Sequence, residues 1–365
     1  MTSFSPIVIP SDLKKTIDQT IDDYQMLKPK DSILVAVSGG PDSVALTFIL
    51  TQLQQKYQLS FGIAHLNHQL RGVEAARDEL FVKKLAHDLG LFFHNEQKDT
   101  KAYAATHRLS IEEAGRKLRY AFFNRVATDH GYTRIATGHT KDDNAELVLM
   151  NLIRGSGAKG LSGIPPIRQN LYIRPMIQVS KKQILDLLKK NMQPYMIDSS
   201  NTDPAYLRNR IRHSLIPLMQ SEYNPEIVNA LNRLSRVLGC EDDFFEQETQ
   251  RLFHQCLIKE GLVTKRTSSL IFLKSELAVL HPALVNRILR MAIKRLKTNL
   301  NRISMVHMEN IVKFCFHPSS GQSLDLPGQI RIYKTQETIE IKKEDQPLRE
   351  IGKQNKKLRR RIEPK

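Results

Sequence analysis

Residues Ser38–Ser43, with the sequence SGGPDS, combine small side chains and one carboxylate directly after a short apolar run. Small residues allow several backbone N–H groups to point into one concavity, and a helix that begins there adds partial positive charge. Both features favour a phosphate or pyrophosphate ligand. The segment is not a Walker A loop, because no Gly-Lys-Ser/Thr follows it, and this excludes a kinase or GTPase of that type. An ordinary strand-to-helix turn uses the same residue types and is the alternative interpretation.

A second chemical cluster lies in Ala136–Gly155, which contains His139, Asp142, Asp143, Asn144 and Glu146. On a helix, Asp142 and Asp143 both share a face with Glu146, at spacings of four and three residues. Carboxylates this close repel one another unless a cation or an amine lies among them. Acidic residues are also favoured in the first turn of a helix, so capping is the alternative. Three acids with a histidine and an asparagine exceed what capping requires.

Two further segments have less specific patterns. His65–Gly72, HLNHQLRG, follows a predicted strand and could face a nucleotide. Its two histidines are more often hydrogen-bonded scaffold than metal ligands, and no other spacing supports zinc. Glu112–Tyr120, EEAGRKLRY, places Glu112, Arg116 and Tyr120 on one helical face, which an ordinary solvated helix with salt bridges also does.

Positive charge is the unusual feature of the composition. The formal net charge is +17 and the pI about 9.7, which indicates an anionic partner or, alternatively, a solvated basic surface. Arg208, Arg210 and Arg212 within Asp198–His213 suit bidentate phosphate binding, or a solvent-facing helix start. Residues 346–365 hold eight Lys/Arg and two Asp/Glu, typical of a flexible nucleic-acid arm or of solubilising charge.

Alternating strand and helix patterns are expected to position the first four segments. The predicted strands are 33–37, 59–67, 91–95 and 134–139, and helices begin after each of them. This alternation predicts right-handed βαβ units and a parallel, doubly wound α/β sheet. Residues 154–166 form a predicted loop. From Leu207 the pattern becomes mostly helical, with helices expected over 221–260 and 275–297 and short strands over 323–341.

Length and cysteine content limit the class of protein. At 365 residues the chain predicts two or three domains. Cys240, Cys256 and Cys315 form no CxxC pair, which argues against a zinc ribbon and favours a reducing cytoplasm. We find no signal-peptide pattern and no apolar run of the ~18 residues that a transmembrane helix needs.

Five motifs, in this order along the chain, resemble those of the tRNA(Ile)-lysidine synthase family of N-type ATP pyrophosphatases: SGGPDS, HLNHQLR, EEAGRKLRY, TGHTKDDNAE with NLIRGSGAKGLSGI, and DSSNTDPAYLRNRIRH. The resemblance covers nearly all of Ile33–Asn224, and Leu324–Ile341 resembles the family's C-terminal part. The chain departs from the family pattern at Gly115, usually alanine, and at Leu147, usually threonine. Neither departure removes a charge, so activity is expected to survive without the threonine hydroxyl.

The resemblance implies a cytoplasmic ligase that joins L-lysine to carbon 2 of the wobble cytidine in the minor isoleucine tRNA with anticodon CAU. ATP and Mg²⁺ are the implied cofactors, and AMP and pyrophosphate leave through an adenylated tRNA intermediate. The product, lysidine, changes codon specificity from AUG to AUA and identity from methionine to isoleucine. The implied partners are tRNA, ATP and lysine, with no membrane. The sequence leaves the oligomeric state open, and the resemblance allows a homodimer.

The same resemblance implies roles for individual residues. Those expected to bind ATP are Ser38, Gly39, Gly40, Pro41, Asp42, Ser43, His65 and Gly138. Those expected to act in catalysis are Asp42, Arg116, His139, Asp143 and Glu146. Lysine is expected to bind Asp42, Asp143 and Glu146, tRNA is expected to bind Arg208, Arg210 and Arg212, and Mg²⁺ is expected to bind Asp42.

The implied domains are a catalytic ATP pyrophosphatase domain over 1–222, a mostly helical tRNA-binding domain over 223–345 and a basic tail over 346–365. One alternative is a tRNA cytidine thiolase of the same superfamily. Such enzymes commonly use catalytic cysteines or an iron–sulfur cluster, and the N-terminal half of this chain has no cysteine. The other alternative is a non-catalytic RNA-binding relative, which would need no carboxylates beside an RNA backbone.

Overall fold

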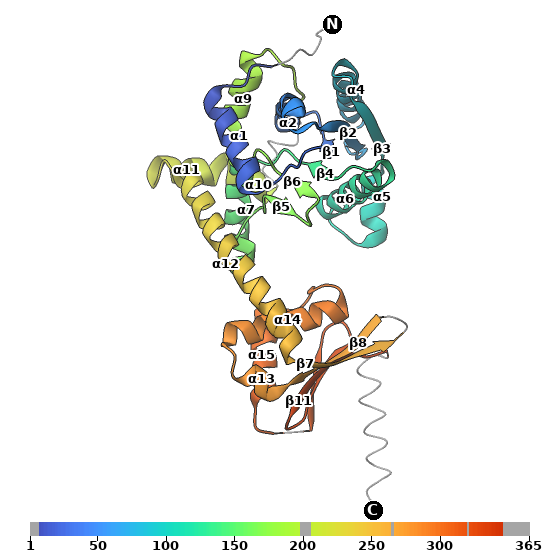
Figure 1. Cartoon of the computed structure of the whole chain (residues 1–365), viewed down its shortest axis with the longest axis vertical. Coiled ribbons are helices and arrows are strands. Elements are labelled where there is room, and N and C mark those ends of the chain that lie inside the picture. The colour runs from blue at the N-terminus through green and yellow to red at the C-terminus, as the bar shows by residue number, and fades with distance from the viewer. Residues whose placement is uncertain (1–6, 198–205, 264–265, 320, 346–365) are drawn as a thin grey trace, which may run out of the picture. The chain divides into compact units, whose positions relative to one another are not determined.

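The computed structural model describes residues 7–197, 206–263, 266–319 and 321–345 (Figure 1). The chain forms two compact units, Met1–Gly239 and Cys240–Lys365. The predicted tail and the first part of the predicted Asp198–His213 segment lie outside the described residues. The division between the compact units falls within a helix, after the predicted boundary at residue 222. The three-domain organisation stays a prediction.

A six-stranded sheet of order β3-β2-β1-β4-β6-β5 forms the centre of the first unit. The central strand β1 (Ser32–Ala36) pairs in parallel with β2 (Ser60–Asn67) and β4 (Arg134–Ala136). The outer strands are β3 (Phe92–Gln97), β6 (Tyr172–Ile173) and β5 (Ile167–Arg168). Among these described strands only β5 runs antiparallel, on β6. The predicted parallel α/β sheet and its four predicted strands are confirmed.

Helices cover both faces of this sheet, as expected for a doubly wound fold. Ile33 and Val35 of β1 pack on one face in a core with α1, α2, α4 and α9, and Leu34 packs on the other face with α6. Successive side chains of a strand point to opposite faces, so one buried strand joins both layers. The helices of this part are α1 (Ser11–Asp23), α2 (Pro41–Gln52), α3 (Gln54–Tyr57), α4 (Val73–Asp88), α5 (Thr100–His107), α6 (Ile111–His130), α7 (Lys141–Ile153), α8 (Ala158–Leu161) and α9 (Lys181–Lys190).

Side-chain caps fix where several of these helices begin. In the capping boxes of α6 and α9, Ser110 pairs with Glu113 and Ser180 with Gln183, as their spacing predicted. The 154–166 segment is not wholly a loop, because it contains the short helix α8.

Helical structure follows residue 206, as predicted. Helix α10 (Leu207–Arg210) runs into a π-helical turn, Ile211–Leu215, and then into α11 (Ile216–Glu222). Helix α12 (Ile227–Cys256) comes next, and the apolar side chains of its first turns pack with this segment against α7. Single π-helical turns are rare and often lie at functional sites.

The second unit packs helices on a five-stranded antiparallel sheet of order β7-β8-β11-β10-β9. Its own core includes the fully buried Leu289, Ile293, Ile330 and Ile341. Its elements are β7 (Leu257–Val263), β8 (Arg266–Leu273), α13 (Lys274–Ala278), α14 (Pro282–Lys297), α15 (Met305–Phe316), β9 (Gln322–Leu326), β10 (Ile330–Lys334) and β11 (Thr338–Lys343). The strands predicted over 323–341 are confirmed. No helix among the described residues is long and apolar enough to cross a membrane.

Two helix predictions need correction in this part of the chain. The helix predicted to reach residue 260 ends at Cys256, where β7 begins and pairs with β8. Short apolar runs fit either a helix or a strand, so the cross-strand pairing decides. The helix predicted over 275–297 is divided, because Pro282 lacks a backbone N–H and starts α14 instead of continuing α13.

Gly62 in β2 lies directly beneath the Tyr132 ring. A Cβ atom at Gly62 would lie 1.9 Å from Tyr132 Oη and 2.6 Å from Cζ, so the ring would have to move. We expect Gly62→Ala to lower the free energy of unfolding of the first unit by about 1–3 kcal/mol, measured by chemical denaturation. Gly157→Ala is the control, because a Cβ atom there meets nothing within 4 Å. Equal losses in both variants would contradict this packing.

Candidate active site

A cavity of about 790 Å³ opens at the carboxyl ends of β1, β2 and β4, where parallel sheets commonly bind ligands. The predicted site residues that line it are Ser38, Asp42, Ser43, His65, Arg116, Gly138, His139, Asp143, Arg208 and Arg212. Those that do not line it are Gly39, Gly40, Pro41, Glu146 and Arg210. The fold therefore brings most of the separate motifs to one place.

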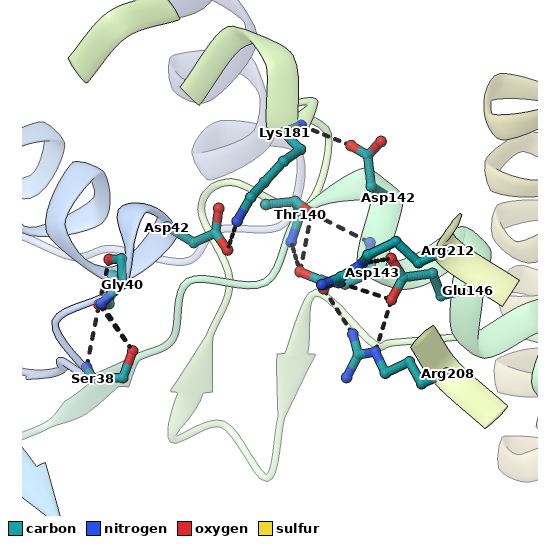
Figure 2. Close-up of polar contacts among 11 residues, drawn as sticks. Ser38, Gly40, Asp42, Thr140, Asp142, Asp143, Glu146, Lys181, Arg208 and Arg212 are labelled. Carbon is teal, nitrogen blue, oxygen red and sulfur yellow. Dashed lines mark hydrogen bonds and ion pairs between the residues drawn. The ribbon is translucent and has the colours of Figure 1, made fainter. Parts of the chain in front are cut away.

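The Ser38–Ser43 loop closes on itself at the end of β1 (Figure 2). Ser43 Oγ accepts a hydrogen bond from the Ser38 N–H at 3.2 Å and donates one to the Gly40 carbonyl at 2.9 Å. Gly39 has a φ of +93°, a backbone conformation that residues other than glycine rarely adopt. Helix α2 begins within this segment, with Pro41 at its first position. This geometry suits an anion such as a phosphate.

Lys181, which belongs to none of the sequence motifs, forms an ion pair with Asp42 of this loop (Figure 2). The other carboxylate oxygen of Asp42, Oδ1, is buried and has no hydrogen-bond partner among the described residues. Burial raises the pKa of Asp42 above its ordinary value, and the Lys181 ammonium offsets only part of this effect. The carboxylate therefore has one paired oxygen and one that could receive a ligand.

Asp142 holds Lys181 in place through the backbone. Asp142 Oδ2 accepts a hydrogen bond of 2.7 Å from the Lys181 N–H at the start of α9. This contact joins the first turns of α7 and α9 and places the Lys181 side chain over the loop. Asp142 thus has a positioning contact and does not line the cavity. The capping box predicted where α9 begins, but no local signal indicated which residue Lys181 would meet.

A compact ion-pair cluster joins α7 to the segment after residue 206 (Figure 2). Arg208 donates to Asp143 and to Glu146, each at 2.7 Å. Arg212 donates to Glu146 at 2.6 and 3.0 Å and to Asp143 at 3.2 Å. Two carboxylates and two guanidinium groups therefore neutralise one another. The cation expected among the acids is present, and the chain itself supplies it.

The two acids of this cluster differ in access to the cavity. Glu146 is 1% exposed and lies beneath the arginines, whereas Asp143 lines the cavity. Asp143 also completes the capping box of α7 with Thr140, so the capping interpretation and the chemical one both apply to it. Burial alone would raise the pKa of Asp143, but the Arg208 charge and the other nearby groups together bring it below its ordinary value.

The predicted tRNA-binding arginines lie in different surroundings. Arg208 and Arg212 face the carboxylates, whereas Arg210 is exposed. A contact of these residues with tRNA stays a prediction, and for Arg208 and Arg212 it would compete with the ion pairs.

His139 lies at the end of β4 within hydrogen-bond distance of Thr137, with 3.0 Å between Nδ1 and Oγ1. Burial, aided by the Arg174 charge, lowers the pKa of His139 to about 4. The imidazole is therefore neutral near pH 7, which suits an orienting role better than the donation of a proton.

The wall of the cavity opposite the acids contains the histidine motif. The Nδ1 atom of His65 lies 2.8 Å from the Val37 carbonyl, and burial lowers the pKa of His65. His68 lies 3.0 Å from Thr100, and burial lowers its pKa to about 4. Both side chains are held by hydrogen bonds at the cavity wall, and the contact of His65 with ATP stays a prediction.

The two departures from the family pattern have little effect on the cavity. A Cβ atom at Gly115 would lie 3.6 Å from His68, which is ordinary contact distance, so the alanine usual in the family would fit. Leu147 does not line the cavity.

No cluster of three or more potential metal ligands occurs among the described His, Cys, Asp and Glu residues. The free Oδ1 of Asp42 fits Mg²⁺, which often binds through one or two carboxylates together with phosphates.

Comparison with known proteins adds to this geometry. A family model described as a PP-loop domain matches residues 10–219. The tRNA(Ile)-lysidine synthase of Clostridium tetani is 35% identical over 322 residues, which cover 88% of this chain and 67% of that protein. The enzyme of the same name from Geobacter sulfurreducens is 37% identical over 86% of this chain and 65% of its own length. The chain thus spans about two thirds of the length of these relatives.

One solved structure supports the fold. The U34-tRNA thiolase NcsA from Methanococcus maripaludis, with its 4Fe-4S cluster, matches with a TM-score of 0.52 and 18% identity. The match covers 62% of this chain and 78% of that one. At this identity the likeness concerns the fold alone.

Gly138 allows β4 to pass close to the loop after β1. A Cβ atom at Gly138 would lie 3.0 Å from the carbonyl carbon and 3.1 Å from the carbonyl oxygen of Asp42. Since this neighbour is backbone, we expect Gly138→Ala to displace the loop and to weaken ATP binding about tenfold, measured by isothermal titration calorimetry. Gly157→Ala is the control with open space around its Cβ atom. Unchanged ATP affinity in Gly138→Ala would show that the loop tolerates the displacement.

The low pKa of His139 has a consequence for how the reaction rate depends on pH. Because the pKa of His139 is lowered from 6.5 to about 4, the residue does not titrate between pH 6 and 8 in the folded protein. We expect the pH profile of the reaction rate to keep its shape over this range in His139→Asn, even where the rate falls. The unfolded chain binds the proton more readily, so this residue's contribution to stability decreases as the pH falls below about 6.5. If the rate of the unmodified protein changed with pH near 6.5 and this change were absent in His139→Asn, the conclusion that His139 is neutral would be wrong.

Proposed function

The chain belongs to the tRNA(Ile)-lysidine synthase family, and we propose on this premise that it ligates L-lysine to carbon 2 of the wobble cytidine in the minor isoleucine tRNA. ATP is converted to AMP and pyrophosphate, and the modified base is lysidine. One observation carries the proposal: a single cavity is lined both by the Ser38–Ser43 loop and by the Asp143 carboxylate. Activation and transfer act on the same cytidine, so both groups are needed in one site.

In the first step the cytidine O2 attacks the α-phosphate of ATP, and the bond to pyrophosphate breaks. This adenylation converts a poor leaving group, the carbonyl oxygen, into AMP. The loop after β1 would receive the departing pyrophosphate at the N-terminus of α2. Asp42 would hold Mg²⁺ through Oδ1, and the ion would supply positive charge to the phosphates. Lys181, already paired with Asp42, lies where it too could meet a phosphate oxygen.

In the second step the ε-amine of lysine attacks carbon 2, and AMP leaves. The amine has an ordinary pKa of about 10.4, so the site must bind its ammonium form and then remove a proton. Asp143 is the accessible carboxylate to bind the ammonium, and Glu146 lies buried beside it. Asp143 would accept the proton once Arg208, whose charge lowers its pKa, has moved away. Binding would require the ammonium to replace a guanidinium group. Arg208 is the better candidate to move, because its side chain is 43% exposed and that of Arg212 is 31% exposed.

The two alternatives find less support. A thiolase that works through cysteines would need them near the cytidine, but none of the three cysteines lines the cavity. A non-catalytic RNA-binding relative would have no use for a phosphate loop beside buried carboxylates. The substrate tRNA would be met in the cytoplasm, where we place the protein, and a homodimer stays a prediction.

Nucleoside mass spectrometry tests the proposal directly. Unmodified minor isoleucine tRNA is incubated with the full chain, ATP, Mg²⁺ and L-lysine, then digested and analysed. We expect a cytidine with the mass of one added lysine, formed only when ATP is present. A sulfur-for-oxygen mass change would support the thiolase instead, and an unmodified cytidine with intact tRNA binding would support the binding protein.

The Asp143→Asn variant tests whether Asp143 binds the lysine substrate. It retains the shape of Asp143 but removes the charge that an ammonium ion needs, so we expect at least a tenfold higher KM for lysine with ATP affinity little changed. Asp186→Asn, at an exposed position of α9, is the matched control. A normal lysine KM in Asp143→Asn would remove Asp143 from the lysine pocket without contradicting the ligase activity itself.

A further inference from the structure

Three arginines gather around the ring of Tyr120 beside the cavity. The guanidinium carbons of Arg116 and Arg168 each lie 5.1 Å from the ring centroid. Arg174 is buried next to them, at 2% exposure. Burial and the charges of Arg168 and Arg116 act together to lower the pKa of Arg174, although Tyr120 opposes them. We call Arg116, Tyr120, Arg168 and Arg174 the Tyr120 cluster.

Separate elements hold the Tyr120 cluster together. Arg116 and Tyr120 lie one turn apart on α6, Arg168 ends β5, and Arg174 directly follows β6. The rings of Tyr120 and Tyr172 pack edge to face with centroids 4.9 Å apart, which fixes α6 against β6. The arrangement is therefore part of the folded core and not a chance meeting of surface side chains.

The positive charge of the Tyr120 cluster has no counter-charge within the described part of the chain. None of its three arginines forms an ion pair with a described carboxylate, and Arg116 and Arg168 donate no hydrogen bond to any described residue. Arg174 donates to the Pro165 carbonyl and is hydrogen-bonded to Tyr120, but its Nε is buried without a partner. Like charges held this close repel one another, and a buried guanidinium donor without a partner is costly.

Three other arginines that line the cavity are paired with carboxylates, whereas Arg119, which also lines it, approaches His68 Nε2 at 3.4 Å. Arg208 and Arg212 meet Asp143 and Glu146, and Arg71 meets Asp78. The fold thus supplies carboxylates to Arg71, Arg208 and Arg212 and none to the Tyr120 cluster. This contrast indicates that an anion from outside the chain completes the Tyr120 cluster.

We propose that the Tyr120 cluster binds a phosphodiester group of the tRNA strand next to the wobble nucleotide. Arginine binds phosphate oxygens in a bidentate manner and stacks on aromatic rings, and the Tyr120 cluster offers both contacts. Arg116 and Tyr120 line the cavity into which the cytidine must be turned out of its stack, so the backbone on either side of that nucleotide passes them. The proposal rests on the proposed function, because it takes the substrate to be tRNA.

The phosphates of ATP are a less suitable ligand for the Tyr120 cluster. They have their own site in the loop at the end of β1, whereas Arg174 and Arg168 belong to β6 and β5, two and three strands away. Neighbouring strands lie about 4.8 Å apart, so the backbones of Arg174 and Arg168 are displaced from the loop by two and three strand spacings, and a phosphate seated in the loop is not centred on the Tyr120 cluster. A second, separate phosphate is needed, and a nucleic-acid strand provides one at every nucleotide.

The test compares tRNA binding by the unmodified chain and Arg168→Ala as a function of KCl concentration, without ATP or lysine. We expect the variant to bind minor isoleucine tRNA about tenfold more weakly at low salt. The slope of log K against log salt should fall by about one, because one phosphate contact is lost. The loss should be similar for an elongator methionine tRNA, since a phosphate contact reads no sequence. ATP affinity and the unfolding temperature should not change.

Arg125→Ala is the matched control, because it removes one arginine of α6, the helix of Arg116 and Tyr120, whose side chain is paired with Glu96. Arg168→Lys, which keeps the charge and loses the bidentate geometry, should lie between the two. Normal tRNA affinity and salt slope in Arg168→Ala would overturn the proposal, as would a loss confined to ATP binding. Because these measurements need no turnover, they can fail while lysine transfer is observed, and succeed while it is not.

Discussion

Buried charge has to be paired, and this constraint decides how the site is built. Asp143 and Glu146 lie at the start of α7, where repulsion between them would destabilise the fold if they were alone. Arg208 and Arg212 supply the opposite charge from a segment more than sixty residues further along the chain. The π-helical turn next to Arg210 lies within the stretch that carries both guanidinium groups. Breaking one side of such a cluster leaves an uncompensated charge, which is why the four residues act as one structural unit.

The same constraint connects the phosphate loop to the rest of the site. Asp42 is paired with Lys181, and Asp142 fixes the backbone from which Lys181 extends. Without ligands, each acid that was expected to bind the lysine substrate therefore meets a cation of the chain itself. Binding at these positions proceeds by exchange of partners, so the affinity for a substrate ammonium or a metal ion is reduced by the strength of the internal pair that it replaces.

The cavity is electrically asymmetric for this reason. On its acidic side, carboxylates and internal cations balance, whereas the Tyr120 cluster on another side retains positive charge among aromatic rings. A ligase that joins a cationic amino acid to a polyanionic strand has use for both environments. The parallel sheet makes this arrangement possible, because the carboxyl ends of its strands bring side chains from distant parts of the chain to one edge.

Local sequence was enough to predict the parallel sheet, the loop after β1 and the helix starts at Ser110 and Ser180, because periodicity and capping act over a few residues. It also indicated that the acids around Asp143 needed a cation. Only the tertiary structure decided which cation that was, because Arg208 lies 65 residues from Asp143 and no local pattern encodes their contact. The pairing of β7 with β8 and the gathering of arginines around Tyr120 were likewise settled by packing between distant segments. The sequence determines which charged residues the fold must neutralise. The partner of each charge depends on which elements the folded chain brings within a few ångströms of it.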